Sequence, residues 1–147
     1  MRLLALIAVV AATSSTLRSQ QTHRLPATPQ TVVYGYYWAE AKPALRIKSG
    51  DIIDVETMLT STPQRLEAAG LPASEVQPSL RAILERGADR GPGGHILTGP
   101  VFVEGAEPGD VLEVKVLSIG LPIAYGYNGC QGFMRELCER PTTTITP

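Results

Sequence analysis

Hydrophobic and polar residues alternate with a period of two in several short runs of this chain, a pattern typical of β-strands. Each run is rich in β-branched or aromatic residues, and turn residues separate the runs. The pattern therefore predicts a mainly β protein, in which antiparallel strands form part of a sandwich or barrel-like sheet system. The predicted strands are residues 32–38, 44–47, 52–57, 101–103 and 111–119, of which 52–57 and 111–119 show the alternation and 32–38 is assigned from its β-branched and aromatic content.

Two Gly-Asp turns precede similar strand sequences. Gly50-Asp51 leads into DIIDVE, and Gly109-Asp110 leads into DVLEVK. We expect Asp51 to serve its turn by accepting hydrogen bonds from backbone N–H groups. The likeness of the two segments indicates a structural echo, without demonstrating a sequence repeat.

One segment has a helical period instead. Pro78 suits a first helical position, and Leu80 and Ile83 fall on one face of residues 78–86. Residues 60–77 are mixed and predict a long loop with at most a short helical turn. The sequence therefore predicts one short α-helix, which packs against the strands and carries no chemistry.

Composition limits the size and the partners of this fold. The 147 residues, of which 44% are hydrophobic and 18% charged, suffice for one modest domain. Thirteen Lys and Arg against fourteen Asp and Glu leave a net charge of −1, and the basic residues are scattered. This distribution argues against nucleic acid as a partner.

The amino end has the pattern of an export signal. Arg2 precedes an apolar run at residues 3–12, and small residues follow it. The run is shorter than the roughly 20 residues of a membrane-spanning helix, although an uncleaved anchor or a buried strand remains an alternative. We therefore expect a signal peptide at residues 1–20, a polar linker at 21–31, and a secreted or periplasmic protein without a membrane anchor after cleavage.

The chain has two cysteines, Cys130 and Cys138. An oxidising compartment would allow them to form a disulfide, provided that their Cα atoms lie within about 7 Å. A catalytic cysteine is less favoured, because it needs a nearby base. His95 is the one histidine of the expected folded part, since His23 falls in the expected linker.

Candidate chemistry begins with three side chains. His95 follows Gly93 and Gly94, which permit close backbone approach. From the residues alone, a loop histidine with a satisfied hydrogen bond is favoured over a base or a ligand. Asp54 and Glu56 share one face of their strand and could converge on a site, but alternation alone favours solvated carboxylates of an edge strand.

Several stretches resemble the acetamidase/formamidase family. The densest are residues 94–100 (GHILTGP) and 105–114 (GAEPGDVLEV), with further likeness at residues 49–57, 125–128 (YGYN) and 132–133. The resemblance covers roughly residues 32–133. It implies hydrolysis of small amides to a carboxylate and ammonia.

The resemblance also implies roles for particular residues. His95 and Glu56 become candidates for catalysis and for binding a divalent metal such as zinc, with Asp54 as a secondary ligand. Tyr127 and Asn128, in the later loop, and Thr98 become candidates for binding the amide substrate, although aromatic packing is an alternative role for the tyrosine.

The family pattern continues beyond Asn128 with a Gly-Asp-x-His block and an acidic run, neither of which this sequence contains. We therefore read residues 32–147 as the amino-terminal part of such a domain, active only within a longer protein. Unpaired strand edges should favour homo-oligomers. A catalytically inactive β-rich binding or assembly module of the same fold is the alternative.

Overall fold

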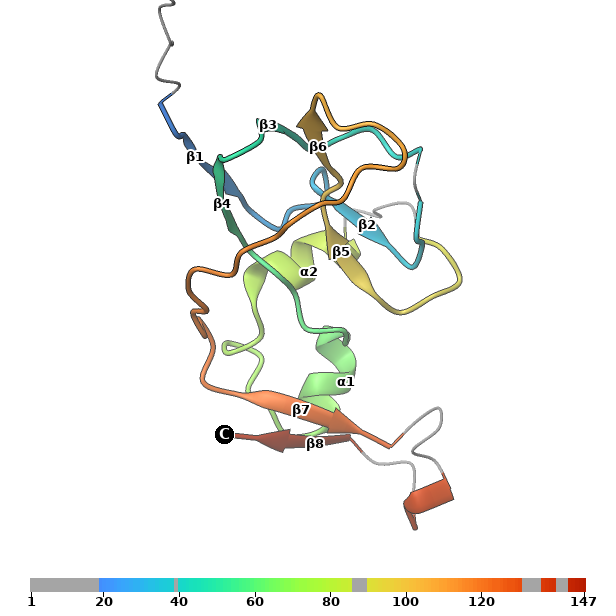
Figure 1. Ribbon diagram of the computed structural model, residues 1–147. Coiled ribbons are helices and arrows are strands. Elements are labelled where there is room, and N and C mark those ends of the chain that lie inside the picture. The colour runs from blue at the N-terminus through green and yellow to red at the C-terminus, as the bar shows by residue number, and fades with distance from the viewer. Residues whose placement is uncertain (1–18, 39, 86–89, 131–135, 140–142) are drawn as a thin grey trace, which may run out of the picture.

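The computed structural model describes residues 19–38, 40–85, 90–130, 136–139 and 143–147. Within these ranges the chain forms eight strands and two short helices (Figure 1). The predicted mainly β class is therefore confirmed. The expected signal peptide lies almost entirely outside the described residues.

The strands associate in four separate pairs. Two pairs are antiparallel and join β2 (Val32–Tyr34) to β5 (Ile96–Thr98) and β7 (Gly126–Gly129) to β8 (Thr143–Thr146). The other two are parallel and join β1 (Thr22–Leu25) to β4 (Ile52–Val55) and β3 (Leu45–Lys48) to β6 (Val101–Glu104). The expected antiparallel arrangement is wrong for these two pairs, whose members are separated by long crossover connections.

Two helices occur where the sequence predicted one. The expected helix is α2 (Pro78–Glu85), which buries Leu80 and Ile83. The second helix, α1 (Pro63–Ala68), lies in the expected loop, where the sequence allowed at most a short helical turn. The Thr62 side chain caps α1 by accepting a hydrogen bond from the backbone N–H of Arg65 at 3.2 Å.

The hydrophobic core lies between the two helices and the β2–β5 pair. Leu66 of α1 and Leu80 and Ile83 of α2 are fully buried. Tyr34 of β2 and Ile96 of β5 close the same cluster. The core thus fixes the strand that directly follows His95.

Residues 21–31 are not a linker. Within this segment β1 pairs with β4, Leu25 is buried at the end of β1, and Ala27 belongs to the core cluster. His23 of β1 contacts Asp51 of the turn before β4, at 2.9 Å between Nε2 and Oδ2. The polar, proline-containing composition hid a strand whose stability comes from a partner about 30 residues away.

Both Gly-Asp turns have the same geometry, which confirms the predicted echo at the turns. Gly50 and Gly109 have φ angles of 90° and 104°, which suit glycine. Asp51 Oδ2 accepts from the Lys48 N–H at 3.0 Å, and Asp110 Oδ2 accepts from the Glu107 N–H at 2.9 Å. The expected turn role of Asp51 is confirmed.

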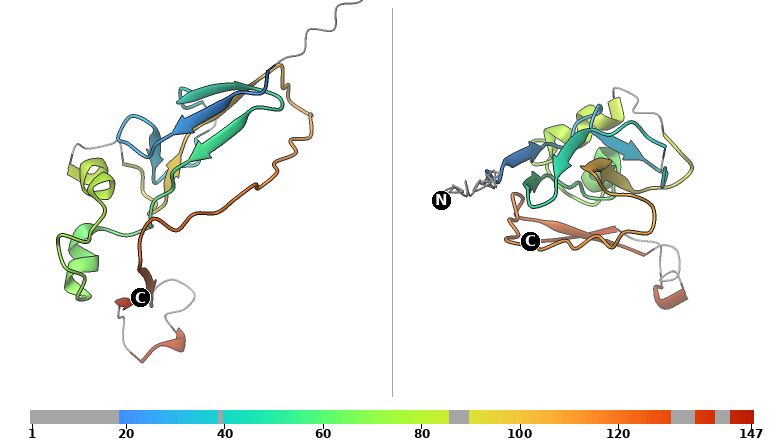
Figure 2. Two further views of the ribbon diagram at one scale, coloured as in Figure 1. Left: turned by 90° about the vertical axis from the view of Figure 1, so that its left-hand side faces the viewer. Right: turned by 45° about the horizontal axis from the view of Figure 1, so that its top comes forward.

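The echo ends after the turns. The first turn leads into β4, which pairs with β1, whereas residues 111–119 form no strand because no described segment pairs with them. In the left view of Figure 2 this segment runs apart from the other strands, as a long extended stretch between β6 and β7. The prediction of a strand at residues 111–119 is therefore wrong.

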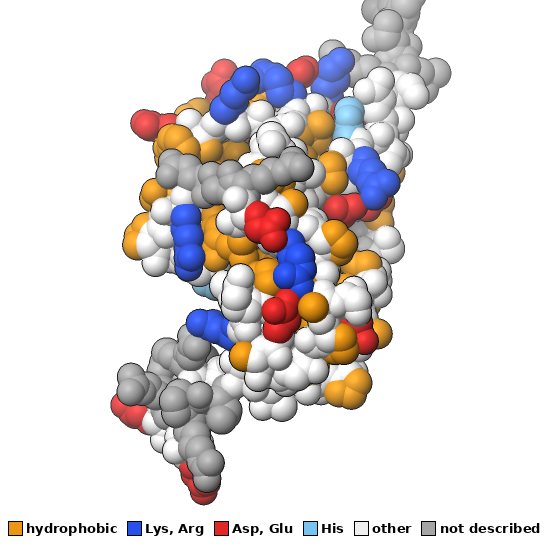
Figure 3. Space-filling view, turned by 180° about the vertical axis from the view of Figure 1, so that it is seen from behind, with side chains coloured by type: hydrophobic (Ala, Val, Ile, Leu, Met, Phe, Trp, Pro, Cys, Tyr) orange, Lys and Arg blue, Asp and Glu red, His pale blue; other side chains and the backbone are white. Residues whose placement is uncertain are grey.

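Cys130 and Cys138 form a disulfide, with their Cα atoms 6.2 Å apart. The bridge joins the end of β7 to residues just before β8. On the face opposite to that of Figure 1, charges of both signs lie close together with hydrophobic side chains between them (Figure 3). None of the helices in the described ranges is long and apolar enough to cross a membrane.

Candidate active site

The backbone of His95 is held by close contact between two glycine-containing segments. The Gly35 N–H donates to the His95 carbonyl at 2.8 Å, and the Gly93 N–H donates to the Gly35 carbonyl at 3.1 Å. A Cβ atom on Gly35 would lie 2.8 Å from the carbonyl oxygens of Gly91 and Gly93, so only glycine fits. This contact confirms the close approach predicted for the Gly-rich turn. Gly35 also ends β2, because its φ angle of 77° is outside the range of a β-strand.

The His95 side chain is exposed and lies beside an aromatic residue. Its ring centroid is 6.4 Å from that of Tyr37, and the two planes are tilted by 47°. The fixed backbone and the exposed ring together present an imidazole to solvent and to small molecules. This exposed position is compatible both with the predicted role of His95 as a base or ligand and with the alternative of a loop histidine.

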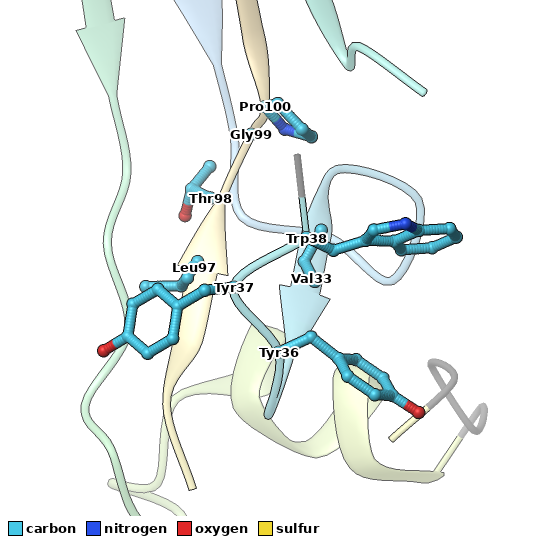
Figure 4. Close-up of a pocket in the computed structure, with 8 residues that line it drawn as sticks. All are labelled: Val33, Tyr36, Tyr37, Trp38, Leu97, Thr98, Gly99 and Pro100. Atoms are coloured by element: carbon cyan, nitrogen blue, oxygen red, sulfur yellow. The ribbon is translucent and has the colours of Figure 1, made fainter. Parts of the chain in front are cut away.

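A pocket of about 280 Å³ lies next to Tyr37. Figure 4 shows its lining, in which aromatic residues that follow β2 face residues of β5 and the turn after it. The volume is just below the roughly 300–1,000 Å³ of sites for drug-sized ligands, so it suits a smaller molecule. The lining residues are Val33, Tyr36, Tyr37, Trp38, Leu97, Thr98, Gly99 and Pro100.

Among the residues of β5 that line this pocket, Thr98 is the one with a side-chain hydroxyl. Its Oγ1 donates to the backbone carbonyl of Glu56 at 2.6 Å. A hydroxyl has one proton to donate and two lone pairs to accept with. Thr98 can therefore still accept a hydrogen bond from an N–H group.

Glu56 lies directly after β4, and its carboxylate is already engaged. Oε1 accepts from Arg24 Nη2 at 2.7 Å, and Oε2 accepts from the Ala27 N–H at 3.3 Å. The Arg24 hydrogen bond, followed by the Ala27 N–H, lowers the pKa of Glu56 below its usual range. Its backbone meets Thr98, but its carboxylate points to the β1 segment. In this chain Glu56 therefore braces β1 against β4.

The remaining predicted residues lie elsewhere. Asp54 is exposed on β4, where it is paired in register with Arg24 of β1. Tyr127 and Asn128 belong to β7. The Tyr127 hydroxyl donates to the Thr60 carbonyl before α1, which matches the packing alternative, while the Asn128 side chain is exposed. The structure brings together Thr98 and the backbone of Glu56, and it places Tyr127 and Asn128 on the hairpin beside α1 (Figure 1). Among the predicted site residues, His95 lies at the other end of β5 from Thr98, beside Tyr37.

The described residues do not form a metal site on their own. No group of three or more His, Cys, Asp and Glu side chains among them lies close enough to hold an ion. Catalytic zinc sites use three protein ligands and a water. Since the carboxylate of Glu56 is paired with Arg24, the residues present do not fit a complete metal centre.

The aromatic residues 36–38 form a wall of the pocket, a role that the sequence did not predict. They were expected to end a strand, whereas Tyr37 is 84% and Trp38 52% exposed. Three consecutive aromatic residues directly after a glycine were the signal, because a central strand would bury every second one.

The fold and the pocket define a mainly β protein with open sheet edges and a small aromatic site beside a fixed histidine. The sequence profile of the Acetamidase/Formamidase family matches residues 26–145, so the chain belongs to this family. An acetamidase from Mycolicibacterium smegmatis is 52% identical over 40 residues, which are 26% of this chain and 10% of that protein. The aligned stretch thus spans about a tenth of the length of that relative.

Proposed function

We propose that this chain is part of an amidase that hydrolyses the C–N bond of small non-peptide amides, of the size of formamide or acetamide, to a carboxylate and ammonia. The observation that carries the proposal is the family match over residues 26–145. The small pocket beside the fixed His95 supports it, because its size suits a small amide.

Amide hydrolysis requires an activated water, a polarised carbonyl and a proton for the departing amine. We assign the proton transfers to His95, since an imidazole can accept a proton from water and return it to the amine. We assign to Thr98 a hydrogen bond accepted from the amide N–H₂ group, because its own proton is directed to the Glu56 carbonyl. Tyr37 and the other aromatic residues of the pocket would contact the rest of the substrate.

The site needs polypeptide beyond the described residues. A divalent metal such as zinc, which the family resemblance implies, does not fit these residues alone. We propose that this chain acts within a longer amidase. The intact mass of the protein isolated from its source tests this idea: a mass well above the 15.7 kDa of the chain supports it, and a mass at or below that value contradicts it.

We also propose that the protein is exported. The amino-terminal pattern predicts a signal peptide, and a disulfide between Cys130 and Cys138 persists best in an oxidising compartment. Amino-terminal sequencing of the isolated protein should find a start between residues 12 and 21. A start at Met1 would contradict export by cleavage.

The activity is tested by ammonia release from formamide and acetamide, with zinc added, by the protein as isolated from its source. His95→Ala should lower the rate by about a hundredfold or more. His23→Ala is the matched control, because it removes the other histidine, which contacts Asp51 away from the pocket. Equal rates in the two variants, or no ammonia from the unmodified protein, would refute the proposal.

A β-rich assembly module without catalysis is the second candidate. The engagement of the Glu56 carboxylate by Arg24 favours it, because that pair leaves the oxygens occupied. An assembly module of this kind predicts that His95→Ala changes only the stability of the protein. It also predicts that the protein retains no zinc when it is incubated with zinc and then dialysed.

A further inference from the structure

Residues 111–121 form an exposed apolar segment in an extended stretch. Val111 is 95% and Ile119 82% exposed, and five more large apolar side chains of this segment are at least 62% exposed. Monomeric soluble proteins rarely expose a continuous apolar patch of this kind. The further exposed residues are Leu112, Val114, Val116, Leu117 and Leu121.

The backbone of this segment is equally unpartnered. Among the described residues, none donates or accepts a backbone hydrogen bond with residues 111–121. The segment follows a Gly-Asp turn of the same geometry as the turn that leads into β4. Because β4 becomes a strand by pairing with β1, the second segment has the turn and the alternation of a strand but lacks a partner.

The charges in the segment indicate which partner fits. Glu113 and Lys115 flank Val114 at equal distance, within an otherwise apolar run. When two copies pair antiparallel with Val114 opposite Val114, Glu113 of each copy lies opposite Lys115 of the other. In the same register Leu112 lies opposite Val116, and Val111 opposite Leu117, so apolar residues meet apolar residues.

The neighbouring registers are unfavourable. When one strand of the antiparallel pair moves by two residues, which keeps the same side chains on each face, Glu113 lies opposite Glu113 or Lys115 lies opposite Lys115. Parallel pairing in register places Glu113 beside Glu113 and Lys115 beside Lys115, which also repel each other. The sequence is thus self-complementary in one antiparallel register. A two-fold symmetric interface requires this kind of self-complementarity.

We propose that residues 111–117 are a docking strand for a second copy of this chain, paired antiparallel about Val114. The pairing satisfies the free backbone groups on one edge of each segment and brings Val111, Leu112, Val114, Val116 and Leu117 of the two copies into contact. This inference is independent of amide hydrolysis, because none of these residues lines the pocket beside His95.

Cysteine cross-linking tests the register. Val114→Cys should form a disulfide-linked dimer, because directly opposed residues have Cα atoms about 4.5–5.5 Å apart, within disulfide range. Val116→Cys should not link to itself, since its two copies would lie about 13 Å apart along the strands. A mixture of Val116→Cys and Leu112→Cys chains should link, because these positions face each other.

Charge reversal tests the attraction. Sedimentation equilibrium of the purified chain should give twice the monomer mass, and Glu113→Lys or Lys115→Glu should raise the dimer dissociation constant roughly tenfold. The double variant, or a mixture of the two single variants, should restore the dissociation constant of the unmodified chain. Glu85→Lys, at an exposed position of α2, is the control and should leave this constant unchanged. A monomeric unmodified chain, or a dimer unaffected by both reversals, would overturn the proposal, as would exclusive pairing with further polypeptide of a longer product.

Discussion

Replacing Gly35 with alanine should be the most damaging single-methyl change near the site. The residue has a φ angle of 77°, which costs a residue with a Cβ about 1–2 kcal/mol. The new Cβ would also lie 2.8 Å from two backbone carbonyl oxygens, those of Gly91 and Gly93. Because backbone atoms cannot move aside as a flexible side chain can, we add roughly 1–3 kcal/mol for this overlap. The expected loss of unfolding free energy is therefore about 2–5 kcal/mol.

Gly50→Ala separates the two contributions. Gly50 has a similar φ angle of 90°, but nothing lies within 4 Å of the position that a Cβ would take there, so only the conformational cost of about 1–2 kcal/mol applies. Urea denaturation of both variants gives the two losses from the midpoints at constant slope. The Gly35 variant should also shift the NMR signals of His95, whose carbonyl accepts the Gly35 N–H. Equal losses in the two variants, with His95 unmoved, would refute the reasoning that this contact positions the histidine.

Three further predictions concern stability. The pKa of Glu56 is lowered in the fold, so its contribution to the free energy of unfolding is full above its unfolded pKa and is lost as pH falls through its folded pKa. Glu56→Gln should therefore be less stable than the unmodified protein near neutral pH, and this difference should disappear in acid. A difference in stability that does not change with pH would contradict the ion pair. Reduction of Cys130–Cys138, measured by urea denaturation with and without reductant, should cost roughly 2.5 kcal/mol for this short loop, and no change would argue against a bridge in solution. Leu80→Ala should cost about 2–5 kcal/mol because the side chain is fully buried, whereas the exposed Leu137→Ala should stay within about 0.5 kcal/mol; similar losses would contradict the core assignment.

The export signal and the family roles of individual residues remain predictions. The structure adds that Thr98, at the end of β5, lines the pocket together with the aromatic run, that His95 precedes β5 and lies beside Tyr37, and that the Glu56 carboxylate is turned to Arg24. The predicted role of Glu56 as a base or ligand therefore requires that this ion pair opens.

The sequence by itself determined the local features of this protein. The strand-like runs located four of the eight described strands (β2, β3, β4 and β6), Pro78 and the apolar spacing located α2, and the Gly-Asp pairs located two turns of equal geometry. These features depend on neighbours within a few residues, which the sequence displays directly.

The tertiary structure alone decided which strands have partners. Residues 22–25 have a polar, proline-flanked sequence but become β1 because β4 lies beside them, whereas residues 111–119 have a clear strand pattern but remain unpaired among the described residues. The same holds for Glu56, whose role depends on Arg24 and Ala27 from β1 and the residues after it. A strand and an ion pair each need a second segment at the right distance, and that segment is brought there by the fold and not by the local sequence.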